Sequence, residues 1–94
     1  MQVNVKELQH ISSILLNHIA AKGTANIELD KDYYWDVPSP QRYNPYQEPT
    51  EHTLGQLDDD WKELQKVVTS DAMTINYHLV WLSAIIRAVG EMPE

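Results

Sequence analysis

An acidic row in the segment NIELDKDYYWDVP, residues 26–38, is the part of the chain whose residue types could do chemistry. Acidic and apolar positions alternate, so Glu28, Asp30 and Asp32 would project from one face of a straight strand. Carboxylates in such a row could hold a divalent cation or exchange protons with a substrate. The sequence has no D-x-D-x-D-G loop with a glutamate at its twelfth position. The alternative is a solvated acidic turn whose charges discourage strand addition.

Four histidines are the other potential metal ligands or catalytic bases. His10 and His18 are eight positions apart, and His52 and His78 stand alone, so there is no H-E-x-x-H motif. His78 falls among apolar positions of a predicted helix, where we expect a buried neutral imidazole bonded to a backbone or tyrosine oxygen. A catalytic or ligand role and a position in an interface remain open for His78.

Motifs for nucleophilic catalysis and phosphate binding are missing from the sequence. There is no cysteine, which removes disulfides, thiolate metal sites and cysteine nucleophiles. No serine lies in a G-x-S-x-G motif, and three dispersed glycines cannot form a phosphate-binding loop. The sequence therefore predicts no cofactor and favours a non-catalytic protein, while a small metal-assisted enzyme that uses histidine and acidic side chains stays an alternative.

The net charge of −7 is concentrated in the middle third of the chain. Residues 28–63 hold ten acids and three bases, whereas the charges of the remaining residues cancel. An acidic surface repels phosphate backbones and attracts basic proteins, so we expect no nucleic-acid partner. No apolar run is long enough to cross a membrane and no secretory signal is visible, which predicts a cytoplasmic protein without a membrane partner.

Three segments have helical periodicity and predict a three-helix core: residues 3–22, 53–69 and 71–89. Gly23 and Gly90 are natural stops for the first and third helices. The second helix starts with a Thr53–Gln56 pair at the spacing of a capping box. The third is apolar nearly all round, with a narrow polar strip formed by Asn76, Ser83 and Arg87. Such a helix is covered by several neighbours or contributes to a subunit interface.

Residues 25–37 alternate with period two, but one straight strand of this length would overshoot a domain of this size. We therefore predict a β-hairpin with a three-residue loop near Lys31, because this register gathers the apolar side chains on one face. That face consists of Ala25, Ile27, Leu29, Tyr33, Trp35 and Val37. The same register points Tyr34 away from the core.

A connection with four prolines, residues 38–52, follows the predicted hairpin and is too rich in proline for a helix or a central strand. Its tyrosines, Tyr43 and Tyr46, suggest that it is attached to the body of the protein. The complete expectation is one domain, residues 1–94, with a mostly helical α+β fold.

Acids and aromatic residues share the middle third of the chain, a mixture that is typical of protein-recognition surfaces. The candidate partner surface consists of Glu28, Asp30, Asp32, Tyr34, Tyr43, Tyr46, Asp58, Asp59 and Asp60.

Two segments, YYWDVPSPQRYNPYQEPTE and TLGQLDDDW, resemble small bacterial proteins of an uncharacterised family. The resemblance covers about a third of the chain and implies a bacterial, cytoplasmic, single-domain protein, with no residue roles. The D-Y-Y run is similar to the acidic Tyr-Tyr patch of colicin-type immunity proteins, although that patch lies on a helix and this run is predicted to lie on a strand.

Three functions are consistent with these patterns. The leading hypothesis is a non-catalytic interaction module, such as an inhibitor, an immunity-like protein or an adaptor, that binds a basic protein. The second is a small protein that binds a divalent metal or uses it for catalysis. The third is a structural homodimer built on surplus apolar surface of the third helix.

Overall fold

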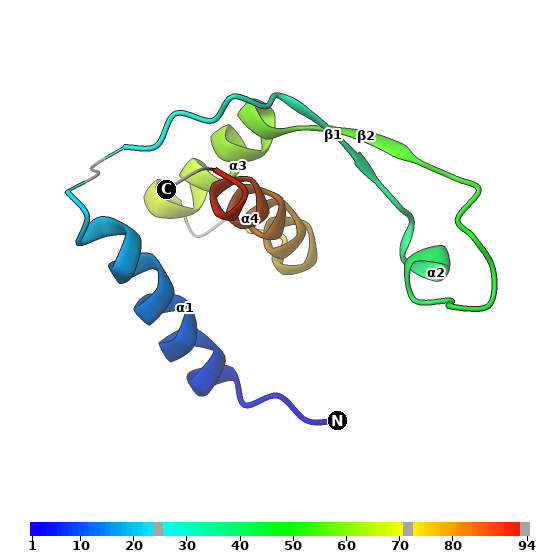
Figure 1. Ribbon diagram of the computed structural model, residues 1–94, viewed down its shortest axis with the longest axis horizontal. Helices are drawn as coiled ribbons and strands as arrows, with labels where there is room; N and C mark the ends of the chain where they lie inside the picture. The colour runs from blue at the N-terminus through cyan, green and yellow to red at the C-terminus, as the bar shows by residue number, and fades with distance from the viewer. Residues whose placement is uncertain (24–25, 71–72, 93–94) are drawn as a thin grey trace.

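The computed structural model describes residues 1–23, 26–70 and 73–92 (Figure 1). Its fold is mostly helical α+β with one two-stranded antiparallel sheet, as predicted. The elements in chain order are α1 (Val5–Ala20), β1 (Tyr33–Asp36), α2 (Ser39–Arg42), β2 (Thr53–Gln56), α3 (Leu57–Thr69) and α4 (Ile75–Gly90). Within these ranges, no helix has the length and apolarity to span a lipid bilayer.

The core lies where α3 packs against α4. Leu57 at the start of α3 and Ile85 and Ala88 near the end of α4 are the buried apolar residues of the described chain. Leu29 and Tyr34 pack against this cluster from the segment that precedes the sheet and from β1. The core is therefore small and is built around two helices.

The sheet differs from the predicted hairpin in its strand pairing. β1 pairs with β2, which lies about twenty residues further along the chain, and not with the residues before Lys31. Tyr33 and Trp35 are 61% and 71% exposed, while Tyr34 is half-buried, so the predicted faces of β1 are reversed. Local alternation cannot reveal this pairing, because the partner strand comes from outside the alternating segment. Ala25 lies outside the described residues.

Residues 53–56, predicted as the first turn of the second helix, form β2. Thr53 makes no capping box with Gln56, since its hydroxyl donates to the carbonyl oxygen of Asp36 across the sheet at 3.3 Å. The backbone N–H of Leu57 donates to the carbonyl oxygen of Asp32 at 2.8 Å. This bond fixes the point where the strand ends and α3 begins.

The other two helices form close to their predicted positions. α1 starts after Asn4, whose side chain caps it by accepting from the N–H of Glu7 at 2.8 Å, and Gly23 follows its end with a φ of +81°. α4 starts at Ile75, later than the predicted residue 71, which lies outside the described residues. No residue of α1 is buried, so the predicted three-helix core is in the structure a two-helix core.

The proline-rich connection contains a short helix, α2, which the prediction missed. Pro40 sits in the first turn of α2, where a missing N–H costs nothing. Gln41 fastens the two sides of the connection, because its Oε1 accepts from the N–H groups of Thr50 and Glu51 at 2.8 and 3.0 Å. Tyr43 and Tyr46 are exposed, contrary to the expectation that they attach the connection to the body.

Candidate functional site

Two adjoining grooves of about 990 and 630 Å³ lie between α4 and the segment that carries the sheet. We call residues 33–56 the arm, and the two grooves together the hollow. The arm comprises β1, α2 and β2 and extends away from the helical core (Figure 1). Both grooves share residues from the underside of β1, from α2 and from the middle of α4, among them Tyr34, Asp36, Arg42 and Val80.

A cross-strand pair holds the arm against α3. Tyr34 lies opposite Gly55, and the tyrosine ring covers the bare glycine so closely that a Cβ there would lie 2.6 Å from two ring carbons. The Tyr34 hydroxyl then reaches α3 and donates to Asp60 Oδ2 at 2.6 Å. Asp60 is only 6% exposed and is the buried charged residue of the described chain.

Burial dominates the electrostatics of the pair formed by Tyr34 and Asp60. Burial raises the pKa of Asp60, although the hydrogen bond from Tyr34 acts in the opposite direction. Burial, followed by the bond to Asp60, raises the pKa of the Tyr34 hydroxyl far above its ordinary 10.0. Tyr34 therefore stays protonated and acts as a donor, which makes it a structural clamp and a poor general base.

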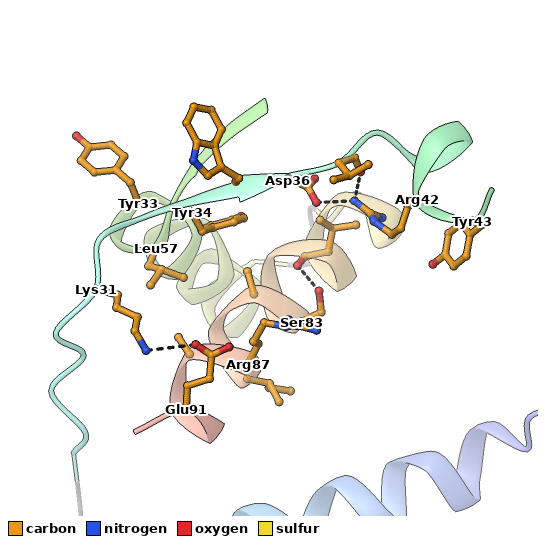
Figure 2. A pocket seen from close by; sticks show the side chains of 16 residues that line it. Lys31, Tyr33, Tyr34, Asp36, Arg42, Tyr43, Leu57, Ser83, Arg87 and Glu91 are labelled. Atoms are coloured by element: carbon orange, nitrogen blue, oxygen red, sulfur yellow. Dashed lines mark hydrogen bonds and ion pairs between the residues drawn. The ribbon is translucent and has the colours of Figure 1, made fainter. Parts of the chain in front are cut away.

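Ion pairs lie at two ends of the larger groove (Figure 2). At one end Lys31 contacts Glu91 at 3.2 Å, which joins the segment before β1 to the end of α4. At the other end Arg42 of α2 contacts Asp36 at 2.5 Å and also donates to the carbonyl oxygen of Val37. Two of the three cations of the middle third, Lys31 and Arg42, thus lie against the groove with acidic partners beside them.

Arg87 lies between these ion pairs and comes from α4 (Figure 2). Within the described part of the chain its side chain makes no ion pair, which leaves its donors available to a ligand. Ser83 lines the same groove one turn earlier on α4. Two of the three residues in the polar strip of the third predicted helix, Ser83 and Arg87, therefore face the hollow.

The smaller groove is acidic and aromatic. Asp36, Asp59 and Asp60 line it, and Arg42 is its one cation among the described residues. Tyr77 and Trp81 of α4 form its other wall and stack with their ring centroids 5.9 Å apart. Aromatic faces beside carboxylates favour lysine and arginine side chains through both charge and cation–π attraction.

The structure divides the predicted partner surface. Tyr34, Tyr43, Asp59 and Asp60 line the hollow, but Tyr34 and Asp60 point inward and bind each other. The other predicted residues are exposed and lie outside the hollow: Glu28, Asp30, Asp32, Tyr46 and Asp58. Asp58 pairs with Lys62 at 2.8 Å, and this contact raises the pKa of Lys62.

The histidines do not gather with the acids. His78 was predicted to be buried and is half-buried. Its Nδ1 lies 3.1 Å from the backbone nitrogen and 2.9 Å from the carbonyl oxygen of Thr74. Its ring packs edge-on against Trp81. His52 packs edge-on against Trp35, with ring centroids 6.0 Å apart. Across the described ranges, no three histidine, aspartate or glutamate residues are placed to hold a metal ion.

Sequence reasoning missed four residues that line the hollow: Arg42, Arg87, Tyr77 and Trp81. Only the polar strip of the third predicted helix gave a signal for any of them, because it contains Arg87, and the sequence assigned it no function. Comparison with known families, with characterised proteins and with solved structures finds no match to this chain. The resemblance to small bacterial proteins therefore stays a prediction.

Proposed function

We propose that the protein is a non-catalytic interaction module that binds a basic segment of a partner protein in the hollow. The observation that carries this proposal is the lining of the hollow, where tyrosine, tryptophan and arginine side chains surround an apolar floor. These three residue types dominate the binding energy of protein interfaces. Each groove has the volume of a small-molecule pocket, but the two adjoin each other along the projecting arm and are open to solvent, so together they suit an extended peptide segment better than a small substrate.

Charge supports a basic partner. The net charge of −7 falls entirely within residues 28–63, which include the arm and the start of α3. Asp59 and the stacked rings of Tyr77 and Trp81 give the smaller groove a place for a lysine or arginine side chain. The larger groove, with Arg87 unpaired among the described residues, supplies donors for an acidic side chain or a backbone carbonyl of the same segment.

Two matched charge reversals test the location of the partner. Asp58→Lys with Asp59→Lys changes the net charge as much as Glu48→Lys with Glu51→Lys, but only the first pair adjoins the hollow. Asp60 is spared because it is buried. Proteins captured from an extract of the source cells are identified by mass spectrometry. We expect the first variant to lose the specific partner and the second to keep it.

Two aromatic truncations separate the hollow from the rest of the arm. Tyr77→Ala removes a wall of the smaller groove, whereas Tyr46→Ala removes a side chain that is 95% exposed and lies outside it. We expect the first to weaken capture by at least about tenfold and the second to leave it unchanged. Equal capture by both variants, together with equal capture by both charge reversals, would refute this function.

A further inference from the structure

α4 has three faces, and one of them is covered by nothing among the described residues. Ile85 and Ala88 face α3 and are buried, while Ser83 and Arg87 face the hollow. The remaining face carries apolar side chains that are 40–58% exposed and line neither groove: Ile75, Leu79 and Leu82. We call these three residues the uncovered face of α4. Their spacing of four and then three residues places them in one line along the helix.

The apolar stripe of α1 is also exposed. Five apolar side chains of its stripe are 46–76% exposed: Val5, Leu8, Ile11, Leu15 and Leu16. α1 lies apart from the pair formed by α3 and α4 (Figure 1), and none of its 16 residues is buried. Most helical stability in proteins comes from packing an amphipathic face, so α1 needs a surface on which to lie.

The chain exposes more surface than a compact monomer of its mass. The chain exposes 8229 Å², whereas a compact monomer of its 10.9 kDa mass exposes about 5,600 Å². Its radius of gyration is 15.1 Å, against about 12 Å for a compact domain of this length. The excess of about 2,600 Å² per chain, to which the projecting arm also contributes, is large enough to include the about 1,000–2,500 Å² that each protomer buries in an obligate dimer.

The lack of net charge on these two apolar surfaces favours a second copy of the chain over a basic partner. Within α1 the charges of Lys6 and Glu7 cancel, and the uncovered face of α4 has none. A basic partner drawn to the acidic middle third gains no electrostatic attraction from these neutral surfaces. A second copy fits them, because two-fold symmetry lets α1 of each chain pack on α4 of the other in two identical contacts.

We propose that the protein is a homodimer in which α1 of each chain covers the uncovered face of α4 of its partner. This interface adjoins the hollow without lining it, since Leu79 and Leu82 line neither groove whereas Ile86, four residues further along α4, lines the larger one. One chain can thus bind a second copy and a basic partner at the same time.

Sedimentation equilibrium of the full chain at micromolar to 100 µM concentration tests the dimer, with an expected mass of twice 10.9 kDa. Leu79→Glu with Leu82→Glu should weaken the dimer on the order of 100-fold or more, because each carboxylate would be buried without a partner. Val68→Glu with Thr69→Glu is the control, as it places the same two charges on exposed residues of α3. The mass of a single chain for the wild type at the highest concentration would overturn the proposal.

A spin-label experiment tests the contact between α1 and α4 without relying on the folding of the glutamate variant. The chain has no cysteine, so His18→Cys on α1 accepts a single spin label. Labelled chains are mixed with ¹⁵N chains that carry no label. Broadening of the Leu79 and Leu82 amide signals shows that α1 reaches the α4 of another chain. Broadening that occurs only when the label and ¹⁵N are on the same chain shows that α1 folds back onto its own α4, and overturns the dimer.

Discussion

Replacing Tyr34 by phenylalanine is the sharpest test of how the arm is held. The change keeps the ring over Gly55 and removes only the hydroxyl that donates to Asp60 at 2.6 Å. At pH 8 the carboxylate of Asp60 is charged, and it is only 6% exposed, so it loses a charge-assisted bond that water cannot fully replace. Hydrogen bonds to charged groups contribute about 1.5–3 kcal/mol, and we expect the free energy of unfolding to fall by that amount.

Urea denaturation followed by circular dichroism measures this loss. Tyr33→Phe is the matched control, because Tyr33 is the neighbouring tyrosine of β1 and lies on its exposed side. Surface substitutions of this kind change the free energy of unfolding by less than about 0.5 kcal/mol. Since a domain of this size loses roughly 4–8 °C of Tm per kcal/mol, the two variants should also separate in a thermal scan.

Tyr34→Phe in an Asp60→Asn background tests whether the charge of Asp60 causes this loss of stability. Asparagine can still accept the bond, but the acceptor is neutral, so Tyr34→Phe should then cost only about 1 kcal/mol. The difference between the two costs is the coupling of the hydroxyl to the buried charge. Equal stability of Tyr34→Phe and Tyr33→Phe, or an equal cost in both backgrounds, would refute the role assigned to the buried carboxylate.

Three further predictions concern the same clamp. Gly55→Ala should lower the Tm in a thermal scan, because the added Cβ displaces the Tyr34 ring. Gly90→Ala is the control: its Cβ meets nothing within 4 Å, so it should stabilise the chain by up to about 1 kcal/mol. Burial raises the pKa of Asp60, so the folded protein binds more protons than the unfolded chain, and this residue's contribution to stability falls as the pH rises from its unfolded value of 3.8 through its folded pKa. Urea midpoints measured between about pH 4 and 8 should lose this component in Asp60→Asn and keep it in Asp30→Asn, which removes an exposed carboxylate that does not act on Asp60. Burial and the bond to Asp60 raise the pKa of Tyr34, so an ultraviolet titration of the wild type should retain at about pH 11 one protonated tyrosine that Tyr34→Phe lacks.

The helices could be predicted because their signals are local. Apolar residues at helical spacing and a glycine near each stop placed α1 and α4 to within a few residues, although the tertiary bond from Leu57 to Asp32 moved the start of α3. The sheet could not be placed in the same way. Its pairing depends on a bare backbone at Gly55 and on a carboxylate one turn into α3, and neither is visible from the alternation of residues 25–37.

A signal for the sheet was nevertheless present in the sequence. Gly55 lies inside a segment predicted as the first turn of a helix, where it costs about 1 kcal/mol relative to alanine. A glycine that breaks a predicted element often marks a close approach of another group, which here is the ring of Tyr34. We predicted Tyr33 and Trp35 to lie in the core because the strand register placed them with the apolar residues. Both are exposed, and the hydroxyl of Tyr34 points inward instead, to Asp60.

The two proposed surfaces respond to salt in opposite ways, and this follows from where the charges lie. The hollow is flanked by Asp58 and Asp59, so screening by salt should weaken the capture of a basic partner. The uncovered face of α4 and the stripe of α1 are apolar and neutral, so salt has no attraction to screen there and reduces the repulsion between two chains of net charge −7. Raising the salt concentration from 50 to about 500 mM should therefore release the partner and leave the dimer at least as stable. If salt dissociated the dimer, its interface would have to be electrostatic, and the assignment to α1 and α4 would be wrong.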